Sequence, residues 1–254
     1  MFPKSVLITG SNRGIGLGLV KELLKISEIE TIIAGARNPE AAKDLQSLSK
    51  DNSRLHLLQI DVSDDNSLKN SVRKVEDFVG ARGLNMLINN GGVLDAYRAD
   101  GSPNKDIVMR TFEVNACGAL LASQYFLPLL QKASVDSPGS DLSPGRACIL
   151  NIGSDCSSQE LNVNGFNDKI HLAYKMSKAA MLSFARSLVA DFQNLDIKVL
   201  VTTIHPGWVI TDMGGPDADI TVEESTSAIV KSIGKLNESH NGGLFDRHLK
   251  EIPF

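Results

Sequence analysis

Tyr174 and Lys178 lie four residues apart in a segment whose composition favours a helix. Residues at positions i and i+4 share one face of an α-helix, so we expect the phenol and the ammonium side by side. A positioned phenol can protonate an oxygen that is becoming an alkoxide, or remove its proton in the reverse direction. The pair therefore predicts acid–base chemistry at a carbonyl or alcohol carbon.

A glycine-rich turn near the N-terminus supplies a second chemical signal. Its spacing is G-x-x-x-G-x-G, between a predicted first strand and a predicted first helix, over Gly10, Ser11, Asn12, Arg13, Gly14, Ile15 and Gly16. Free N–H groups and the positive dipole end of the helix that follows suit a diphosphate. The turn is not a Walker loop, because no Gly-Lys-Ser/Thr follows it. It predicts a dinucleotide site.

The second predicted strand bears on the choice of dinucleotide. Proteins that bind NAD place an acidic residue about 20 residues after the glycine turn, to hold the ribose 2′-hydroxyl. This strand ends Ala34-Gly35-Ala36-Arg37, without an acid. The planar forks of Arg37 and Arg13 suit a 2′-phosphate, so we predict NADP(H); two solvated arginines are the alternative.

The tyrosine needs electrostatic help to act near neutral pH. Lowering a phenol pKa from about 10 to about 7 requires roughly 4 kcal/mol. One cation about 4 Å away supplies a Coulomb energy of that order at an effective dielectric constant of about 20. Lys178 is therefore the expected main influence on the pKa of Tyr174. Desolvation opposes the tyrosinate, so we expect the positive charge of an oxidised nicotinamide to assist.

Short apolar runs that alternate with amphipathic stretches must position these groups. Strands are expected at about 4–9, 30–36, 55–61, 84–89, 147–153, 197–204 and 243–246. Helices are expected near 14–27, 38–50, 64–81, 104–132, 173–193 and 222–236. The strands are apolar on successive residues, which is typical of a parallel sheet buried on both faces. We predict a single-domain, Rossmann-like, doubly wound α/β fold over residues 1–254, with surface loops at 133–146 and 207–221.

Several motifs stand in a characteristic order around these elements. They are Thr9 to Gly16, Asp61-Val62, Asn89-Asn90-Gly91-Gly92, Asn115, Ser154, Tyr174 to Lys178 and Pro206-Gly207. In this order they resemble the short-chain dehydrogenase/reductase family, from about Ser5 to the C-terminus. The segments 205–215 and 241–243 are similar to the Sniffer-type carbonyl reductases and C-factor-like proteins of that family. Two positions depart from its pattern: Gly91 replaces an alanine, and Gly153 replaces the first of two serines.

The resemblance implies a role for each motif. Ser154 would orient the substrate oxygen, Asn115 would hold a water that links Lys178 to solvent, and Lys178 would also bond the nicotinamide ribose. Asparagine is a mediocre helix former, and a local kink at Asn115 would be consistent with this role. The expected cofactor-binding positions beyond the glycine turn and Arg37 are Asp61, Val62, Asn90, Gly91, Tyr174, Lys178, Pro206, Gly207, Val209 and Thr211. Cys156 is treated as incidental, and Trp208 is expected to pack beside the cleft.

Composition restricts partners and compartment. The formal net charge is −4, and no block of Lys and Arg stands out, so a nucleic-acid surface is not expected. Three cysteines without CxxC spacing argue against a disulfide framework, and five scattered histidines show no metal-ligand spacing. The run 4–9 already reads as a strand, which leaves no room for a signal peptide. We expect a cytoplasmic protein without a membrane span or a metal.

The leading hypothesis is NADPH-dependent reduction of aldehydes, ketones or quinones, with Tyr174 as the general acid. A non-catalytic NADP-binding sensor and an NAD-dependent alcohol dehydrogenase are the alternatives, and an isomerase or dehydratase would share the fold. Family members commonly pair through the helices predicted at 104–132 and 173–193. The many apolar side chains over 107–130 agree with a homodimer or homotetramer.

Overall fold

A seven-stranded parallel sheet forms the centre of the protein. The computed structural model describes residues 1–135, 137, 141–163 and 171–254. The sheet order is β3-β2-β1-β4-β5-β6-β7, and every strand pair is parallel. Its strands are β1 (Ser5–Ile8), β2 (Thr31–Ala36), β3 (Leu55–Gln59), β4 (Met86–Asn89), β5 (Cys148–Ile152), β6 (Leu200–His205) and β7 (Leu244–Asp246). The predicted doubly wound α/β fold is confirmed.

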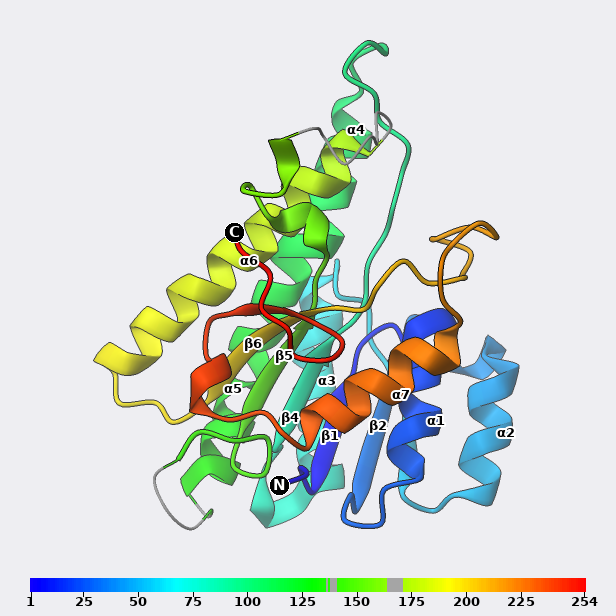
Figure 1. Ribbon diagram of the computed structural model, residues 1–254. Coiled ribbons are helices and arrows are strands. Elements are labelled where there is room, and N and C mark those ends of the chain that lie inside the picture. The colour runs from blue at the N-terminus through cyan, green and yellow to red at the C-terminus, as the bar shows by residue number, and fades with distance from the viewer. Residues whose placement is uncertain (136, 138–140, 164–170) are drawn as a thin grey trace.

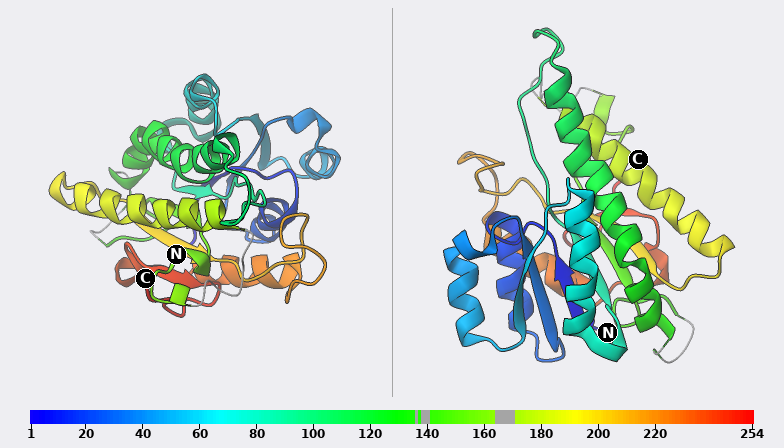
Figure 2. Two further views of the ribbon diagram at one scale, coloured as in Figure 1. Left: turned by 90° about the horizontal axis from the view of Figure 1, so that it is seen from above. Right: turned by 180° about the vertical axis from the view of Figure 1, so that it is seen from behind.

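Helices cover both faces of this sheet (Figures 1 and 2). The helices are α1 (Gly14–Leu24), α2 (Lys43–Asp51), α3 (Asp65–Val79), α4 (Lys105–Phe112), α5 (Gly118–Val135), α6 (Leu172–Asn194) and α7 (Val222–Ile233). Seen from above, α1 and α7 lie on one side of the sheet, and α3, α5 and α6 lie on the other (Figure 2). α4 and the beginning of α6 project beyond the carboxyl ends of the strands (Figure 1).

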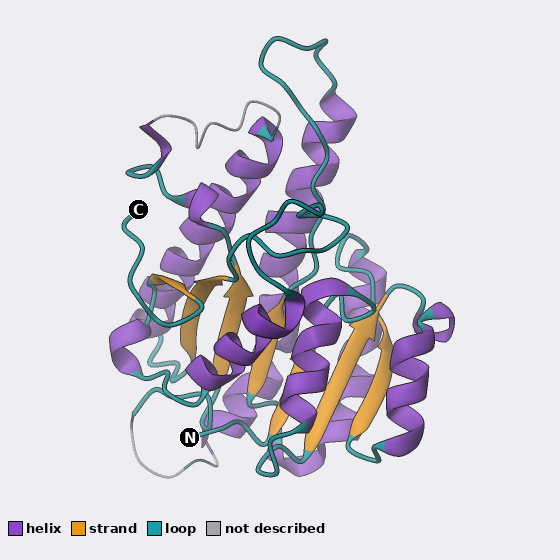
Figure 3. Ribbon diagram, turned by 45° about the vertical axis from the view of Figure 1, so that its right-hand side comes forward, coloured by secondary structure: helices purple, strands orange, loops and turns teal. Residues whose placement is uncertain are grey.

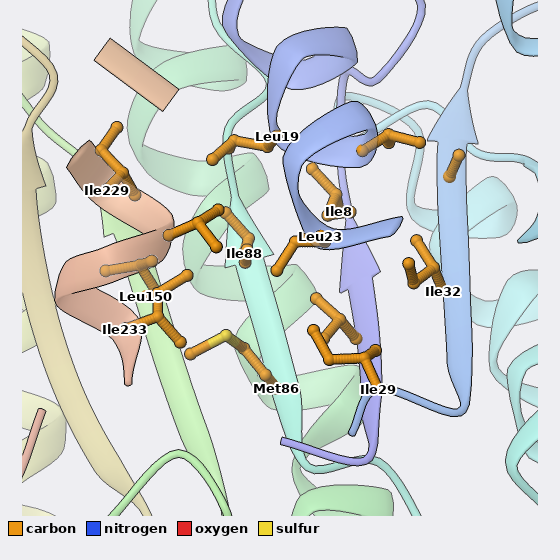
Figure 4. Packing of buried hydrophobic residues seen from close by; sticks show 14 of the residues in the cluster. Ile8, Leu19, Leu23, Ile29, Ile32, Met86, Ile88, Leu150, Ile229 and Ile233 are labelled. Atoms are coloured by element: carbon orange, nitrogen blue, oxygen red, sulfur yellow. The ribbon is translucent and has the colours of Figure 1, made fainter. Parts of the chain in front are cut away.

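Alternate residues of the central strands build the two halves of the core. In β1, Val6 and Ile8 pack toward α1 and α7, whereas Leu7 packs in the cluster on the opposite face; all three are fully buried. Burial of one such side chain contributes about 1.5–3 kcal/mol, so each face anchors its helices. Figure 4 shows the first of these clusters, with Leu19, Leu23, Ile229 and Ile233 over Ile8, Met86, Ile88 and Leu150.

The order of the strands creates the crevice where a ligand is expected. The chain winds outward from β1 through β2 to β3, then returns to β4 on the other side of β1. The loops that follow β1 and β4 therefore leave in opposite directions, which opens a crevice at the carboxyl edge of the sheet. The long loop before α7 lies above this edge (Figure 3).

The helix predicted over 104–132 is divided by one widened turn. A π-helical turn spans Glu113–Cys117, between α4 and α5, and contains Asn115. The helix is thus interrupted at Asn115 by a π-bulge, a feature that often lies at functional sites. The helix predicted over 38–50 is also divided, because a 3-10 turn at Pro39–Ala41 precedes α2.

The loops predicted at 133–146 and 207–221 differ in how far the structure describes them. α5 continues to Val135, and positions 136 and 138–140 lie outside the described residues. The segment 207–221 is a loop of turns and isolated bridges, as predicted. Among the described helices, none combines the length and the apolar character needed to cross a bilayer.

Candidate active site

A cavity of about 1220 Å³ opens at the carboxyl edge of the sheet. Its wall includes the glycine turn, the ends of β4, β5 and β6, the first turn of α6 and the loop 207–214. Cavities of this size at the switch point of an open α/β sheet suit a dinucleotide together with a small substrate. The residues that predicted acid–base chemistry and the residues that predicted phosphate binding therefore share one cavity.

The glycine turn is shaped for close approach of a ligand. Gly10 has a φ of +68°, a conformation that other residues adopt only with strain. A Cβ atom at Gly16 would lie 2.2 Å from the Gly10 carbonyl oxygen, so only glycine fits there. No side chain caps the N-terminus of α1, which begins after Arg13. Its first N–H groups therefore remain available for a phosphate.

The polar residues beside β4 hold the glycine turn in place. Asn90 Nδ2 donates to the carbonyl oxygens of Thr9 and Gly10, at 2.9 and 3.0 Å. The Thr9 hydroxyl oxygen accepts hydrogen bonds from the backbone N–H groups of Asn90 and Gly91, at 3.1 and 3.0 Å. Asn90 also lines the cavity. It thus both supports the turn and faces the expected ligand.

Most residues predicted to bind the adenosine and its 2′-phosphate lie in the wall of the cavity. Arg37 is exposed and lines the cavity together with Asp61 and Val62. Arg13, predicted to share a 2′-phosphate with Arg37, instead forms an ion pair with Asp212, at 2.5 Å. Both side chains are largely exposed, so the pair contributes about 0–1 kcal/mol and can exchange for another partner.

Tyr174 and Lys178 lie on one face of α6 and both line the cavity. The Lys178 ammonium lies 5.7 Å from the centre of the Tyr174 ring and donates to the Ile152 carbonyl oxygen at 2.8 Å. Ser154 lies two residues past the end of β5 and lines the same wall of the cavity. Its hydroxyl donates to Asp155 Oδ1 at 3.1 Å and accepts from the Cys156 N–H at 3.1 Å.

Asn115 lies beneath the cavity rather than in its wall. It is fully buried in the π-helical turn. Its side chain accepts from the Val93 N–H at 2.8 Å and donates to the Val93 carbonyl oxygen at 2.9 Å. It also donates to Ser177 Oγ at 3.0 Å, while Ser177 donates to the Tyr174 carbonyl oxygen at 2.7 Å. Asn115 therefore joins the loop after β4 to the first turn of α6.

Burial, rather than the neighbouring ammonium, has the largest effect on the titration of Tyr174. Desolvation raises its pKa above the ordinary value, Cys156 and Asp155 raise it further, and the contact with Ser154 lowers it. Burial also lowers the pKa of Lys178 to about 8. The expectation that Lys178 is the main influence on the Tyr174 phenol is wrong for the chain by itself. Desolvation is the largest cause of both pKa shifts and disfavours the tyrosinate as well as the ammonium.

Most of the predicted cofactor residues line the cavity. Those that do so are Gly10, Asn12, Arg13, Gly14, Ile15, Gly16, Arg37, Asp61, Val62, Asn90, Gly91, Tyr174, Lys178, Pro206, Gly207, Val209 and Thr211. Ser11 does not, because its side chain is fully buried and its hydroxyl donates to the Ile8 carbonyl oxygen at 2.8 Å. Ser11 completes the turn from within.

Sequence reasoning missed several charged or titratable residues of the cavity wall, among them Asp155, His205 and Arg247. Asp155 directly follows Ser154, His205 ends β6, and Arg247 follows β7. His205 Nδ1 lies 3.7 Å from Asp155 Oδ1, and burial lowers the pKa of its ring. A charged residue next to Ser154 was the available signal for Asp155. His205 directly precedes the predicted Pro206 and Gly207, which was its signal. Arg247 gave none, because only the fold brings it here.

Trp208 and Cys156 complete the wall next to these residues. The Trp208 indole N–H donates to the Gly214 carbonyl oxygen at 2.8 Å, and its ring remains half exposed. Cys156 lines the cavity, and burial raises the pKa of its thiol to about 11. A thiol at neutral pH is protonated under those conditions, which agrees with its treatment as incidental.

The doubly wound sheet, the uncapped helix at its switch point and the Tyr–Lys face of α6 define a dinucleotide-dependent oxidoreductase. The sequence model of the short chain dehydrogenase family matches residues 4–221, and the chain belongs to that family.

Relatives of known structure cover the whole chain. The candidate carbonyl reductase Sniffer of Caenorhabditis elegans is 42% identical, with a TM-score of 0.90 and full coverage of both chains. An NADPH-bound carbonyl reductase from chicken fatty liver is 35% identical, with a TM-score of 0.94, over 100% of this chain and 95% of the other. A further relative, the C-signal of Myxococcus xanthus, is 32% identical over 67% of this chain and 93% of its own length. The protein is a short-chain oxidoreductase that is similar to carbonyl reductases.

Proposed function

We propose that this protein reduces the carbonyl group of aldehydes, ketones or quinones to an alcohol with NADPH. One observation carries the proposal: Tyr174, Lys178 and Ser154 face the same cavity as the glycine turn and Arg37. Acid–base groups and a phosphate cradle at one site are what a nicotinamide-dependent reductase requires. The NADPH-bound chicken enzyme, which this chain resembles over its whole length, supports the choice of cofactor.

The residues of the chain fit NADPH at both ends. The uncapped first turn of α1 and the glycines at positions 10 and 16 would receive the diphosphate, and Arg37 would bind the 2′-phosphate. Lys178 would hydrogen-bond the nicotinamide ribose, with Val209 and Thr211 at the carboxamide. When bound, NADPH supplies the hydride.

Each acid–base residue then has a separate task. The Ser154 hydroxyl would orient the substrate oxygen, and the Tyr174 phenol would donate its proton to that oxygen as negative charge develops. The raised pKa of Tyr174 keeps the phenol protonated at neutral pH, which suits a general acid in the reductive direction. Lys178 would stabilise the tyrosinate, and Asn115 would connect Lys178 to solvent through a water.

A change of Tyr174→Phe tests this assignment. The variant should retain its affinity for NADPH and lose at least about a hundredfold in kcat, because only the proton donor is removed. Oxidation of NADPH would be followed by absorbance with a panel of aldehydes, ketones and quinones. If the variant kept the native rate, Tyr174 would not be the acid.

A non-catalytic NADP-binding signalling protein is the second candidate, because of the relative named C-signal. Tight binding of NADPH without turnover of any carbonyl compound in the panel would favour it. The intact set of Asn115, Ser154, Tyr174 and Lys178 supports catalysis instead.

We also propose a cytoplasmic single-domain protein that forms a homodimer or homotetramer through α4, α5 and α6. Met109 of α4 is an exposed apolar side chain on this surface. Sedimentation equilibrium of the full chain would give the subunit number, and a monomer at micromolar concentration would contradict the proposal.

A further inference from the structure

An acidic side chain stands beside the serine that is proposed to orient the substrate. Asp155 Oδ1 accepts a hydrogen bond from the Ser154 hydroxyl at 3.1 Å and from the Cys156 N–H at 2.8 Å. Its side chain is 38% exposed and lines the cavity. Within the part of the chain that the structure describes, its Oδ2 atom accepts no hydrogen bond. One carboxylate oxygen thus fixes the local turn, and the other has unused acceptor capacity in the substrate region.

Among the described residues, the basic side chain in contact with the Asp155 carboxylate is His205. His205 Nδ1 is 3.7 Å from Oδ1, but burial lowers the pKa of this histidine, which favours the neutral ring over a cation. A bound substrate removes water from the carboxylate. This desolvation costs free energy unless the substrate supplies a hydrogen-bond donor to the carboxylate. Hydroxyl and ammonium groups form the strong, charge-assisted hydrogen bonds that replace this water.

We propose that Asp155 is a specificity-determining residue that selects carbonyl substrates bearing a hydroxyl or ammonium group next to the carbonyl carbon. The inference rests on the proposed function, because Ser154 must hold the carbonyl oxygen for Asp155 to reach the adjacent carbon's substituent. An α-hydroxy ketone satisfies both residues. Its carbonyl oxygen accepts from Tyr174 and from Ser154, whose single proton turns from Asp155 Oδ1 to the substrate, and its hydroxyl donates to Asp155.

Arg247, in the wall of the same cavity, would favour a substrate that carries a negative charge. It follows β7, lies against Gly207 and forms no ion pair among the described residues. A ketone that carries a carboxylate would be drawn to Arg247 and repelled by Asp155. We assign the substrate to Asp155 because its hydrogen bond to Ser154 places it beside the proposed reacting oxygen, whereas Arg247 lies against Gly207.

The test compares two ketones in the native protein and in Asp155→Asn. 2-Hydroxy-1-phenylethanone carries the hydroxyl donor on the carbon next to the carbonyl. 2-Methoxy-1-phenylethanone has the same skeleton, but its methyl ether cannot donate a hydrogen bond. The native protein should prefer the hydroxy ketone at least about tenfold in kcat/KM, the gain expected from one hydrogen bond to a charged acceptor. Asp155→Asn retains an oxygen for Ser154 and Cys156 and should bring the ratio close to one. Asp217→Asn, the same change outside the cavity wall, should leave the ratio unchanged.

A second measurement uses the native protein alone, in case the variant does not fold. With NADP⁺ bound, 1-phenyl-1,2-ethanediol should bind at least about fivefold more tightly than its methyl ether in calorimetry. Equal affinities, an unchanged kcat/KM ratio in Asp155→Asn, or a native preference for phenylglyoxylate would overturn the assignment while the reductase function stands. If no carbonyl compound is reduced at all, the proposed function fails and the inference fails with it.

Discussion

At the Tyr174 hydroxyl, burial and charge act in opposite directions. Desolvation raises the pKa of the phenol, and it lowers the pKa of Lys178 to about 8. The acid is therefore protonated over the whole neutral range, whereas the ammonium is lost as the pH rises through about 8. In the proposed reduction a proton would leave Tyr174, and the tyrosinate so formed would need that ammonium nearby.

The pH dependence of reduction follows from these two shifts. We expect kcat/KM for reduction to be flat below about pH 7 and to fall as the pH rises past about 8, where Lys178 loses its proton. The measurement is a pH profile of NADPH oxidation with one fixed ketone. A rate that stays constant between pH 6 and 10 would contradict this role of Lys178.

Lys178 should also reduce the stability of the fold. Its pKa is about 8 in the folded chain and 10.5 as the reference value, so the unfolded chain binds more protons between these limits. Stability therefore rises with pH across that window, and the cost of the buried ammonium is fully present below pH 8. Lys178→Met should raise the free energy of unfolding at pH 7 by about 1 kcal/mol and abolish activity.

Chemical denaturation at pH 7 and pH 10 measures this effect. The stabilisation by Lys178→Met should be smaller at pH 10, because the native lysine is then neutral. Lys231→Met, on the exposed face of α7, is the matched control and should change stability by less than about 0.5 kcal/mol. Equal effects of the two substitutions would show that burial of Lys178 has no cost.

At the scale of elements, two glycines at the same crevice should differ sharply. A Cβ at Gly16 would lie 2.2 Å from the Gly10 carbonyl oxygen, which is too close for any relaxed structure. A Cβ at Gly91 would lie 3.4 Å from Thr9 Oγ1 and 3.6 Å from Val62 Cγ2, which are ordinary contacts. The space for the alanine that the family has at Gly91 is therefore still present.

Gly16→Ala should lower the free energy of unfolding by about 2 kcal/mol and weaken NADPH binding, because the turn and α1 must move apart. Gly91→Ala should change stability by less than about 1 kcal/mol in either direction. Thermal melting with and without NADPH checks both. Similar losses in the two variants would mean that the turn is more adaptable than its contacts indicate.

For the whole molecule, the proposed preference for NADPH rests on one exposed arginine at the cavity, Arg37. Arg37→Gln should weaken NADPH at least about tenfold, since a hydrogen bond to a charged phosphate contributes about 1.5–3 kcal/mol. The affinity for NADH should stay unchanged. Fluorescence titration of both dinucleotides measures the difference, with Arg73→Gln, exposed on α3, as the control. Equal weakening of the two dinucleotides would overturn the assignment of NADPH.

The loop 207–221 contributes to the cavity wall and contacts the glycine turn through an ion pair. Arg13 and Asp212 are 199 positions apart in the chain and form an ion pair across the glycine turn. Since Arg13 is also a candidate for the 2′-phosphate, cofactor and loop would share this arginine. The ion pair is exposed and thus contributes little to stability, so exchange costs little.

Local patterns in the sequence were sufficient for the sheet, the glycine turn and the pairing of Tyr174 with Lys178. Strands buried on both faces are apolar on successive residues, and a four-residue spacing places two side chains on one helical face, whatever the rest of the fold does. Even the interruption of the long helix at Asn115 had a local signal, because asparagine is a weak helix former.

Only the tertiary structure decided how the site is charged. Asp155 and His205 meet because β5 and β6 are parallel neighbours whose ends lie together, and Arg13 reaches Asp212 because the loop after β6 crosses the glycine turn. The pKa shifts of Tyr174 and Lys178 arise from atoms of many remote elements that exclude water. Desolvation sums over all of those atoms, so no spacing within one helix determines it.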